Sequence, residues 1–175
     1  DIEGNKIGLL PNGGVNSNGF AGISVQTFSN QNQIGTASNG NTVTNNACNG
    51  IEVLGAGVTG GTQNSIMSNL VFQNGGLGIK LGNPPNTPTP NDVGDADTGP
   101  NTLQNYPVIT AASIAAGTLT VSGTLNSTSN DDFDIQVYSN VACDPSGNGE
   151  GQTLLGSASI TSNGLFVSLA ALTAE

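Results

Sequence analysis

The residues best suited to bind an ion are three carboxylates in the run 91–97, Asn-Asp-Val-Gly-Asp-Ala-Asp. Carboxylates spaced by glycine and small residues suit a hard cation that takes about six to eight oxygen ligands. We therefore predict a calcium site at Asp92, Asp95 and Asp97. The alternative is an Asx-rich turn, in which the same carboxylates accept hydrogen bonds from backbone N–H groups.

The residue types that are missing exclude several kinds of chemistry. The chain has no histidine, so it cannot build a Ser-His-Asp triad, a Cys-His dyad or a zinc site of the usual histidine-containing kind. Lys6 and Lys80 are the only cations, and the net charge is -10. Because phosphate contacts need a basic surface, we expect no nucleic-acid partner.

The two cysteines, Cys48 and Cys143, lie far apart in the chain. Two positions alone do not define a disulfide. Cysteine is also a common buried apolar residue, so two buried thiols are the favoured interpretation and a disulfide is the alternative.

A repeat of 28 residues runs through the first half of the chain and must position any site there. The segment 18–25, Asn-Gly-Phe-Ala-Gly-Ile-Ser-Val, recurs in related form at 46–53 and 74–81. A fixed period of this size is typical of a stacked array. The units show alternating apolar residues with glycine and asparagine between them and no helical period. We expect about three coils of a parallel β-helix.

Stacking in register places equivalent residues above one another. Ile23, Ile51 and Ile79 are expected to form one internal column, because alternate residues of a strand point to the same side. A second internal column is expected from Val25, Val53 and Leu81.

Two polar rows follow from the same register. Glu52 and Lys80 share one outward slot, so an exposed ion pair is predicted between them. A ladder at a turn is predicted for Asn18, Asn46 and Asn74.

Three features also carry a family resemblance: the Asn-x-Ile-Gly units at 5–8 and 32–35, the Gly-Ile-x-Val rungs, and the run 94–107. Through them, residues 1–107 resemble bacterial right-handed parallel β-helix repeat proteins of cell surfaces and secretions. The resemblance implies a right-handed β-helix and an extracellular or cell-surface location. Family members are usually longer, so the resemblance implies that this chain is a C-terminal portion of such a protein.

The remaining residues suggest two further parts. Four prolines in 83–90 rule out a helix, so 83–107 is expected to be a Pro/Asp-rich linker that caps the coils of 1–82. Alternating apolar residues return in 108–175 and predict about five strands, the pattern of an antiparallel sandwich. That segment resembles the Ig-like modules that often follow such β-helices. Because Ig-like sandwiches use about seven strands, an incomplete sandwich is expected.

The function expected from these parts is a non-catalytic structural or adhesive module of an extracellular protein. The coils offer no pair of carboxylates for glycoside hydrolysis. Open strand edges, including an uncapped first coil at Asp1, favour self-association head to tail into a filament, or binding of other surface proteins. The alternative is a carbohydrate-binding module of a secreted polysaccharide-active protein, and a degenerate β-helix lyase comes third. No run of 18 apolar residues is present, so membrane insertion is not expected.

Overall fold

The computed structural model describes residues 1–55, 60–83, 85–162 and 167–168, and it is all-β. The chain forms two compact units. The first comprises Asp1–Pro88, Thr98–Leu103 and Tyr138–Leu154, and the second comprises Thr89–Asp97, Gln104–Val137 and Leu155–Glu175. Within the described ranges, no helix is long and apolar enough to cross a membrane.

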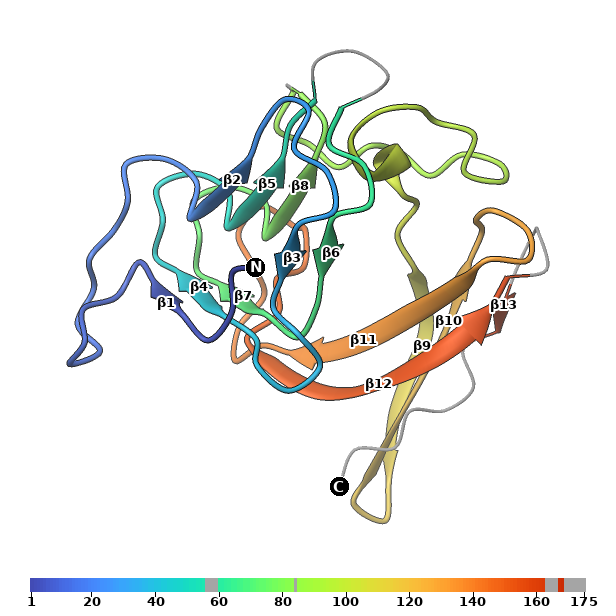
Figure 1. The fold of residues 1–175 in the computed structure, drawn as a ribbon. Helices are drawn as coiled ribbons and strands as arrows, with labels where there is room; N and C mark the ends of the chain where they lie inside the picture. The colour runs from blue at the N-terminus through green and yellow to red at the C-terminus, as the bar shows by residue number, and fades with distance from the viewer. Residues whose placement is uncertain (56–59, 84, 163–166, 169–175) are drawn as a thin grey trace. The chain divides into compact units, whose positions relative to one another are not determined.

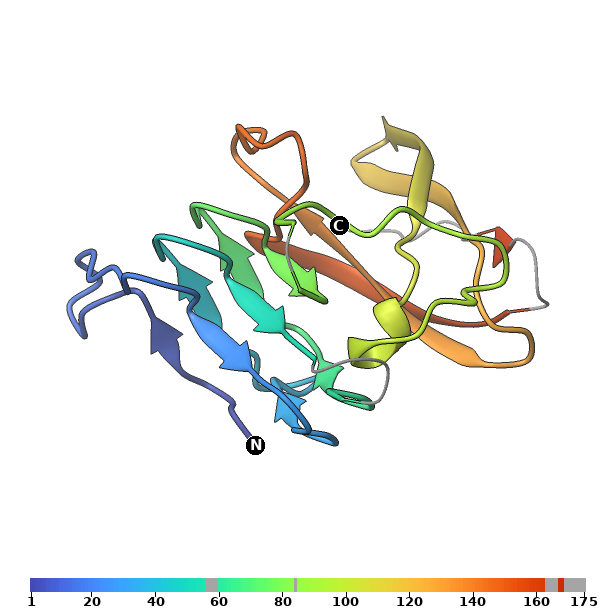
Figure 2. The same ribbon diagram turned by 90° about the horizontal axis from the view of Figure 1, so that it is seen from above.

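Three parallel sheets build the coils of the first unit (Figure 1). One sheet contains β1 (Lys6–Ile7), β4 (Thr42–Thr44) and β7 (Leu70–Phe72). The second contains β2 (Ile23–Val25), β5 (Ile51–Val53) and β8 (Ile79–Leu81). The third contains β3 (Gln33–Ile34) and β6 (Ser65–Ile66), and Ile2 adds a parallel bridge to Ile34. Figure 2 shows the rungs stacked one behind another, as the repeat predicts.

The predicted register of the internal columns is confirmed. Ile23 lies opposite Ile51, and Ile51 lies opposite Ile79, in parallel pairing. Exposure falls from 6% at Ile23 to 0% at Ile51 and rises to 49% at Ile79. Ile79 is on the last rung, where no further rung of the described chain covers it. The isoleucine column is therefore shielded from solvent at Ile51 and exposed to solvent at Ile79.

The coil core consists of buried aliphatic residues from all three sheets. They are Ile23, Val25, Ile34, Val43, Ile51, Val53 and Val71.

The coils differ in path although the sheets stay in register. From β2 to β5 and from β4 to β7 the spacing is 28 residues, whereas β3 and β6 are 32 residues apart. Four extra residues before β6 are balanced by four fewer between β6 and β7. A longer turn at one corner is thus compensated at the next, and the apolar residues keep their inward side.

The second unit is antiparallel. Its first sheet has the order β13-β10-β9, formed by Val167–Ser168, Thr118–Leu125 and Val108–Ala115. Its other sheet pairs β11 (Asp132–Ser139) with β12 (Thr153–Thr161), although the ends of these strands at 138–139 and 153–154 belong to the first unit. These strands lie within 108–175, where the sequence predicts about five strands. Residues 163–166 and 169–175 of that range lie outside the described residues.

The core of the second unit is small. Leu125 and Ile135 are buried, and Phe133 and Ile160 pack against them. All eight residues of β9 are exposed. The antiparallel strands therefore enclose much less apolar surface than the coils do.

The compact units interleave along the chain, whereas the expected ranges 1–82, 83–107 and 108–175 follow one another. Part of the expected cap does cover the coils, since the short 3-10 segment η1 (Pro100–Leu103) belongs to the first unit. Asn101 of η1 donates from its backbone to the carbonyl oxygen of Gly61 at 2.8 Å. Residues 138–154 also belong to the first unit, and Glu150 of this segment contacts Asn74 of the third coil.

Candidate functional site

The predicted asparagine ladder is confirmed and leads to the most distinctive site in the first unit. Asn18 Nδ2 donates to Asn46 Oδ1 at 2.8 Å. Asn46 donates in turn to Asn74 Oδ1, from Nδ2 at 2.9 Å and from its backbone N–H at 3.2 Å. Asn46 and Asn74 are buried, and a buried amide without partners would destabilise the fold. The ladder therefore satisfies side chains that the tight turn encloses.

Two further ladders were not predicted. In one, Asn5 donates to Asn41 and Asn41 donates to Asn69, each from both the backbone and the side-chain nitrogen. In the other, Asn32 donates in the same way to Asn64. Backbone N–H groups can only donate, so the amide oxygens must face the preceding rung. In each ladder, the asparagine of the earlier rung donates to the side-chain oxygen of the asparagine on the next rung.

The Asn18 ladder ends on Glu150, which comes from the segment that joins β11 and β12. Asn74 donates to the Glu150 carboxylate from Nδ2 at 3.1 Å and from its backbone N–H at 3.4 Å. Next to it, Gly151 and Val71 exchange both backbone hydrogen bonds, at 2.6 and 2.8 Å, in an antiparallel bridge. Glu150 thus accepts the hydrogen bonds that a fourth asparagine of the ladder would accept. The next residue, Gly151, pairs with the edge of β7.

The segment around Glu150 holds its own shape through short polar contacts. Asn140 accepts a hydrogen bond from Gln152 N at 3.0 Å and donates to the Glu150 carbonyl oxygen. Asp144 Oδ1 accepts from Ser146 N at 2.8 Å, as an aspartate does in an Asx turn. The contacts of Asn140 join the two ends of the loop, and the contact of Asp144 forms a tight turn within it.

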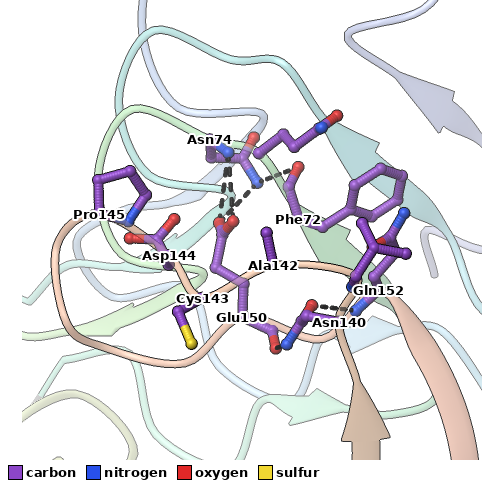
Figure 3. Close-up of a pocket in the computed structure, with 11 residues that line it drawn as sticks. Phe72, Asn74, Asn140, Ala142, Cys143, Asp144, Pro145, Glu150 and Gln152 are labelled. Carbon is purple, nitrogen blue, oxygen red and sulfur yellow. Dashed lines mark hydrogen bonds between the residues drawn. The ribbon is translucent and has the colours of Figure 1, made fainter.

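A groove of about 400 Å³ lies between this loop and the third coil (Figure 3). Figure 3 shows the Glu150 carboxylate directed at Asn74, with Asp144 and Cys143 on the neighbouring part of the loop. Phe72, Val141 and Pro145 supply apolar lining, and the amides of Asn140 and Gln152 supply polar lining. The groove combines one apolar wall with amide and carboxylate groups.

Burial raises the pKa of Glu150 above its ordinary value of 4.5, and the charge of Asp144 raises it further. The hydrogen bonds from Asn74 oppose this shift, because they stabilise the charged carboxylate. Burial also raises the pKa of Tyr138, whose ring lies against Gly151. Glu150 is therefore a partly desolvated acceptor whose pKa lies above the ordinary value.

The two carboxylates of this site, Glu150 and Asp144, act as hydrogen-bond acceptors. The Glu150 carboxylate already receives three hydrogen bonds from Asn74, and Asp144 receives one from its own loop. Sequence reasoning missed both residues as a site. Glu150 lies 76 residues beyond Asn74, outside the repeat, so no spacing in the sequence marks it as a ladder residue.

The carboxylates predicted to bind calcium lie in the second unit, and two of the three, Asp92 and Asp95, accept hydrogen bonds from their own chain. Asp92 accepts hydrogen bonds from Ala96 N, at 3.2 Å for each oxygen. Asp95 accepts from Asn105 N at 3.0 Å and from Ser127 Oγ at 2.6 Å. The contacts with Ala96 and Asn105 are to backbone N–H groups, as the alternative Asx-rich turn predicts, whereas the contact with Ser127 is to a side-chain hydroxyl.

Among the described residues, no three acidic or cysteine side chains group so as to hold a metal ion. Calcium at Asp92, Asp95 and Asp97 stays a prediction. Thermal unfolding with EDTA and with millimolar calcium checks it, because a bound ion raises the melting temperature.

Lys80 and Glu52 share one slot of the register but do not form the predicted ion pair. Lys80 is 4% exposed, and its Nζ donates to the carbonyl oxygens of Leu81 at 2.8 Å and Asn83 at 3.1 Å. Glu52 accepts instead from Ser24 and Asn49. Burial lowers the pKa of Lys80, and the nearby Glu52 charge raises it in part.

The thiols of Cys48 and Cys143 are free, and no disulfide joins them. Cys48 is half-buried and Cys143 is exposed, so the expectation that both are buried is wrong. Cys143 lies on the loop around Glu150, outside the repeat. The repeat therefore does not predict whether this side chain is buried or exposed.

Comparison with known protein families, with curated proteins and with solved structures finds no match to this chain.

Proposed function

We propose that this chain is a non-catalytic structural or adhesive module of an extracellular or cell-surface protein. The observation that carries the proposal is the use of the buried polar residues. In the described part of the chain, every buried side-chain nitrogen and oxygen has a hydrogen-bond partner. The asparagines in particular bind rung to rung, so the polar groups of the coils stabilise a scaffold.

The arrangement of the carboxylates supports the same proposal. Glu52 on the coils accepts from Ser24 and Asn49, and Glu150 accepts from Asn74. Glycoside hydrolysis needs one carboxyl group as an acid and a second one free to attack or to activate water. Carboxylates that already accept hydrogen bonds from neighbouring side chains stabilise the fold and are not free to act as this acid or base.

Exposed aromatic residues of the first unit support association with other chains as the mode of action. Phe20 and Phe28 are 80% and 65% exposed. Large apolar side chains on the surface mark places where another protein can pack.

The experiment has two readouts on the same purified chain. Incubation with a panel of neutral and acidic polysaccharides should release neither reducing ends nor unsaturated uronides. Hydrogen exchange should show slow exchange for the amides of Ile34, Val43 and Ile51, as expected of a rigid scaffold. Turnover that disappears in Glu150→Ala would contradict the proposal.

The second candidate is a carbohydrate-binding module, and the groove beside Glu150 favours it. Phe72 offers an apolar ring face, and Asn140 and Gln152 offer amides, which together suit a neutral sugar. A glycan array separates the two candidates. Binding that is weakened by Phe72→Ala and unchanged in Phe28→Ala, which lies outside the groove, would favour the sugar-binding candidate.

A further inference from the structure

The groove beside Glu150 is lined by two acidic side chains, Asp144 and Glu150, and by no basic one. Figure 3 shows the Asp144 carboxylate beside that of Glu150, and the charge of Asp144 raises the pKa of Glu150. The two carboxylates therefore lie close enough to repel each other. The chain has only two cations, Lys6 and Lys80, and Lys80 Nζ donates to nearby backbone carbonyl oxygens. The groove thus carries negative charge that no lining side chain neutralises.

Two lining atoms have hydrogen-bonding capacity that the described chain does not use. Asp144 Oδ1 accepts from Ser146 N, whereas Asp144 Oδ2 accepts from no described residue. Gln152 Oε1 accepts from Val141 N, whereas Gln152 Nε2 donates to no described residue. A backbone N–H can only donate, so the amide oxygen of Gln152 must face Val141 and its nitrogen must face away. Beside the charge of Glu150, the groove therefore offers a ligand one further carboxylate oxygen and one amide donor.

The lining favours an organic cation over a metal ion. A hard cation such as calcium takes about six to eight oxygen ligands. No group of three acidic or cysteine side chains that could hold a metal ion occurs among the described residues, and the groove has two carboxylates. Phe72, Val141 and Pro145 line the same groove, and apolar side chains pack against carbon rather than against a hydrated ion. An ammonium group on a carbon frame matches both features.

The amide and the volume indicate what carries the ammonium group. The groove of about 400 Å³ is within the size of small-molecule sites. A sugar ring has an apolar C–H face that can lie on Phe72, and its hydroxyl oxygens can accept from Gln152 Nε2. The alkyl chain of a lysine has no acceptor for that amide. A neutral sugar, in turn, leaves the two carboxylates without a cation. A sugar with an amino group uses all of these features.

A second groove, of about 460 Å³, adjoins the first along the same loop. It is lined by residues 140–144 and 147–149, and Asp144 is its acidic residue. Residues 140–144 line both grooves, so an oligomer that fills the first groove has the second one next to it. The site therefore suits a unit of an oligosaccharide better than a single ring.

We propose that this groove binds a protonated amino sugar within an oligosaccharide. The ammonium group pairs with the carboxylates of Asp144 and Glu150, the ring packs on Phe72, and a hydroxyl group accepts from Gln152 Nε2. The inference rests on the proposed function, since it names what the adhesive module binds. It differs from recognition of a neutral sugar in one respect, because acetylation of the amino group removes the charge that the carboxylates recognise.

The test compares two tetrasaccharides on the full chain by isothermal titration calorimetry, in a buffer in which the amino groups are protonated. One is the tetramer of glucosamine and the other is the tetramer of N-acetylglucosamine, which lacks the charges. The glucosamine tetramer should bind, and the acetylated tetramer should bind at least about fivefold more weakly, because it loses ion pairs with both carboxylates. Tetralysine, which carries ammonium groups without rings, should bind more weakly than the glucosamine tetramer.

Substitutions in the groove assign the binding to its carboxylates. Asp144→Asn and Glu150→Gln each remove one charge and keep an oxygen for the contacts with Ser146 and Asn74. Each should weaken binding of the glucosamine tetramer by roughly two- to fivefold, as expected for one partly exposed ion pair. Their double variant should bind both tetramers equally. The control Asp134→Asn makes the same charge change on β11, outside the groove, and should leave the binding unchanged.

A further pair of variants tests the ring face. Phe72→Leu keeps an apolar side chain but removes the aromatic ring, so it should raise the Kd for both tetramers. Phe28→Leu makes the same change outside the groove and should leave both Kd values unchanged.

Four outcomes would overturn the inference. They are no binding of the glucosamine tetramer, equal binding of the two tetramers by the wild-type chain, binding of tetralysine as tight as that of the glucosamine tetramer, and a loss in Asp134→Asn as large as that in Asp144→Asn. If Glu150→Gln does not fold, Asp144→Asn decides the question by the same measurement. None of these outcomes bears on polysaccharide turnover or on amide exchange in the coils, so the proposed function is judged separately.

Discussion

Asn74 and Glu150 are joined by contacts from two nitrogens of the asparagine to one carboxylate, although 76 residues separate them. Within the coils, Asn18 and Asn46 each donate to the Oδ1 atom of the next asparagine in this ladder. At this position the acceptor is a carboxylate, which has no hydrogens to donate and so ends the row. The relationship explains why the loop around Glu150 packs against the third coil.

Removal of this acceptor should destabilise the first unit. Glu150→Ala leaves the Asn74 backbone N–H without its partner, whereas Nδ2 keeps the carbonyl oxygens of Val43 and Phe72. We expect a loss of about 1–3 kcal/mol in the free energy of unfolding. Glu150→Gln keeps one carbonyl oxygen and should lose less. Urea denaturation followed by circular dichroism measures both. The matched control is Asp144→Ala, which removes an exposed contact inside the loop and should change stability by no more than about 0.5 kcal/mol.

The raised pKa of Glu150 predicts a specific dependence on pH. Between the ordinary value of 4.5 and the raised value, the folded chain binds more protons at this site than the unfolded chain does. The contribution of Glu150 to stability therefore falls as pH rises through that window and is largest below it. Glu150→Gln cannot titrate, so its stability relative to wild type should increase from pH 4 towards neutral pH.

Denaturation curves at several pH values give this difference directly. In Asp144→Asn, which removes a charge that raises the pKa of Glu150, the dependence on pH should be weaker than in wild type. A difference between Glu150→Gln and wild type that does not vary with pH would contradict a raised pKa.

The sequence contained enough information for the register of the coils. A strict period places Ile23, Ile51 and Ile79 in one row, and it places Asn18, Asn46 and Asn74 in another. The other two ladders escaped notice because their members are spaced by 36 and 28 residues, or by 32. Turns of unequal length break a fixed period while the strands keep their pairing.

The end of the stack could not be predicted from the repeat. Lys80 has the outward position of its rung, and alternation alone predicts that it is exposed. At the last rung its Nζ folds onto nearby carbonyl oxygens, so it is buried, while Ile79 in the inward row is half exposed. Glu150 and Gly151 reach the coils through tertiary packing, which has no signature in local spacing.

Close packing between rungs predicts that Gly50 cannot be replaced. A Cβ atom at this position would lie 2.7 Å from the Gly78 carbonyl oxygen and would also clash with Val71 Cγ1. Because the contacts are with the next rung, Gly50→Ala must push two coils apart, and we expect a loss of about 1–3 kcal/mol or more. The control is Gly19→Ala, since a Cβ there meets no heavy atom within 4 Å. Thermal unfolding should separate the two variants clearly, and equal melting temperatures would contradict this packing.

The isoleucine column predicts a graded series from one repeated substitution. Ile51 is fully buried between two rungs, so Ile51→Ala should cost about 2–5 kcal/mol through lost contacts and an unfilled cavity. Ile23 is 6% exposed, and Ile23→Ala should cost somewhat less. Ile79 is 49% exposed on the last rung, and Ile79→Ala should have the smallest effect of the three. Urea denaturation of the three variants under one condition gives the order. Because the side chain removed is the same each time, only the enclosure of each rung differs. A loss at Ile79 as large as that at Ile51 would show that the last rung is covered by another part of the chain or by a second copy.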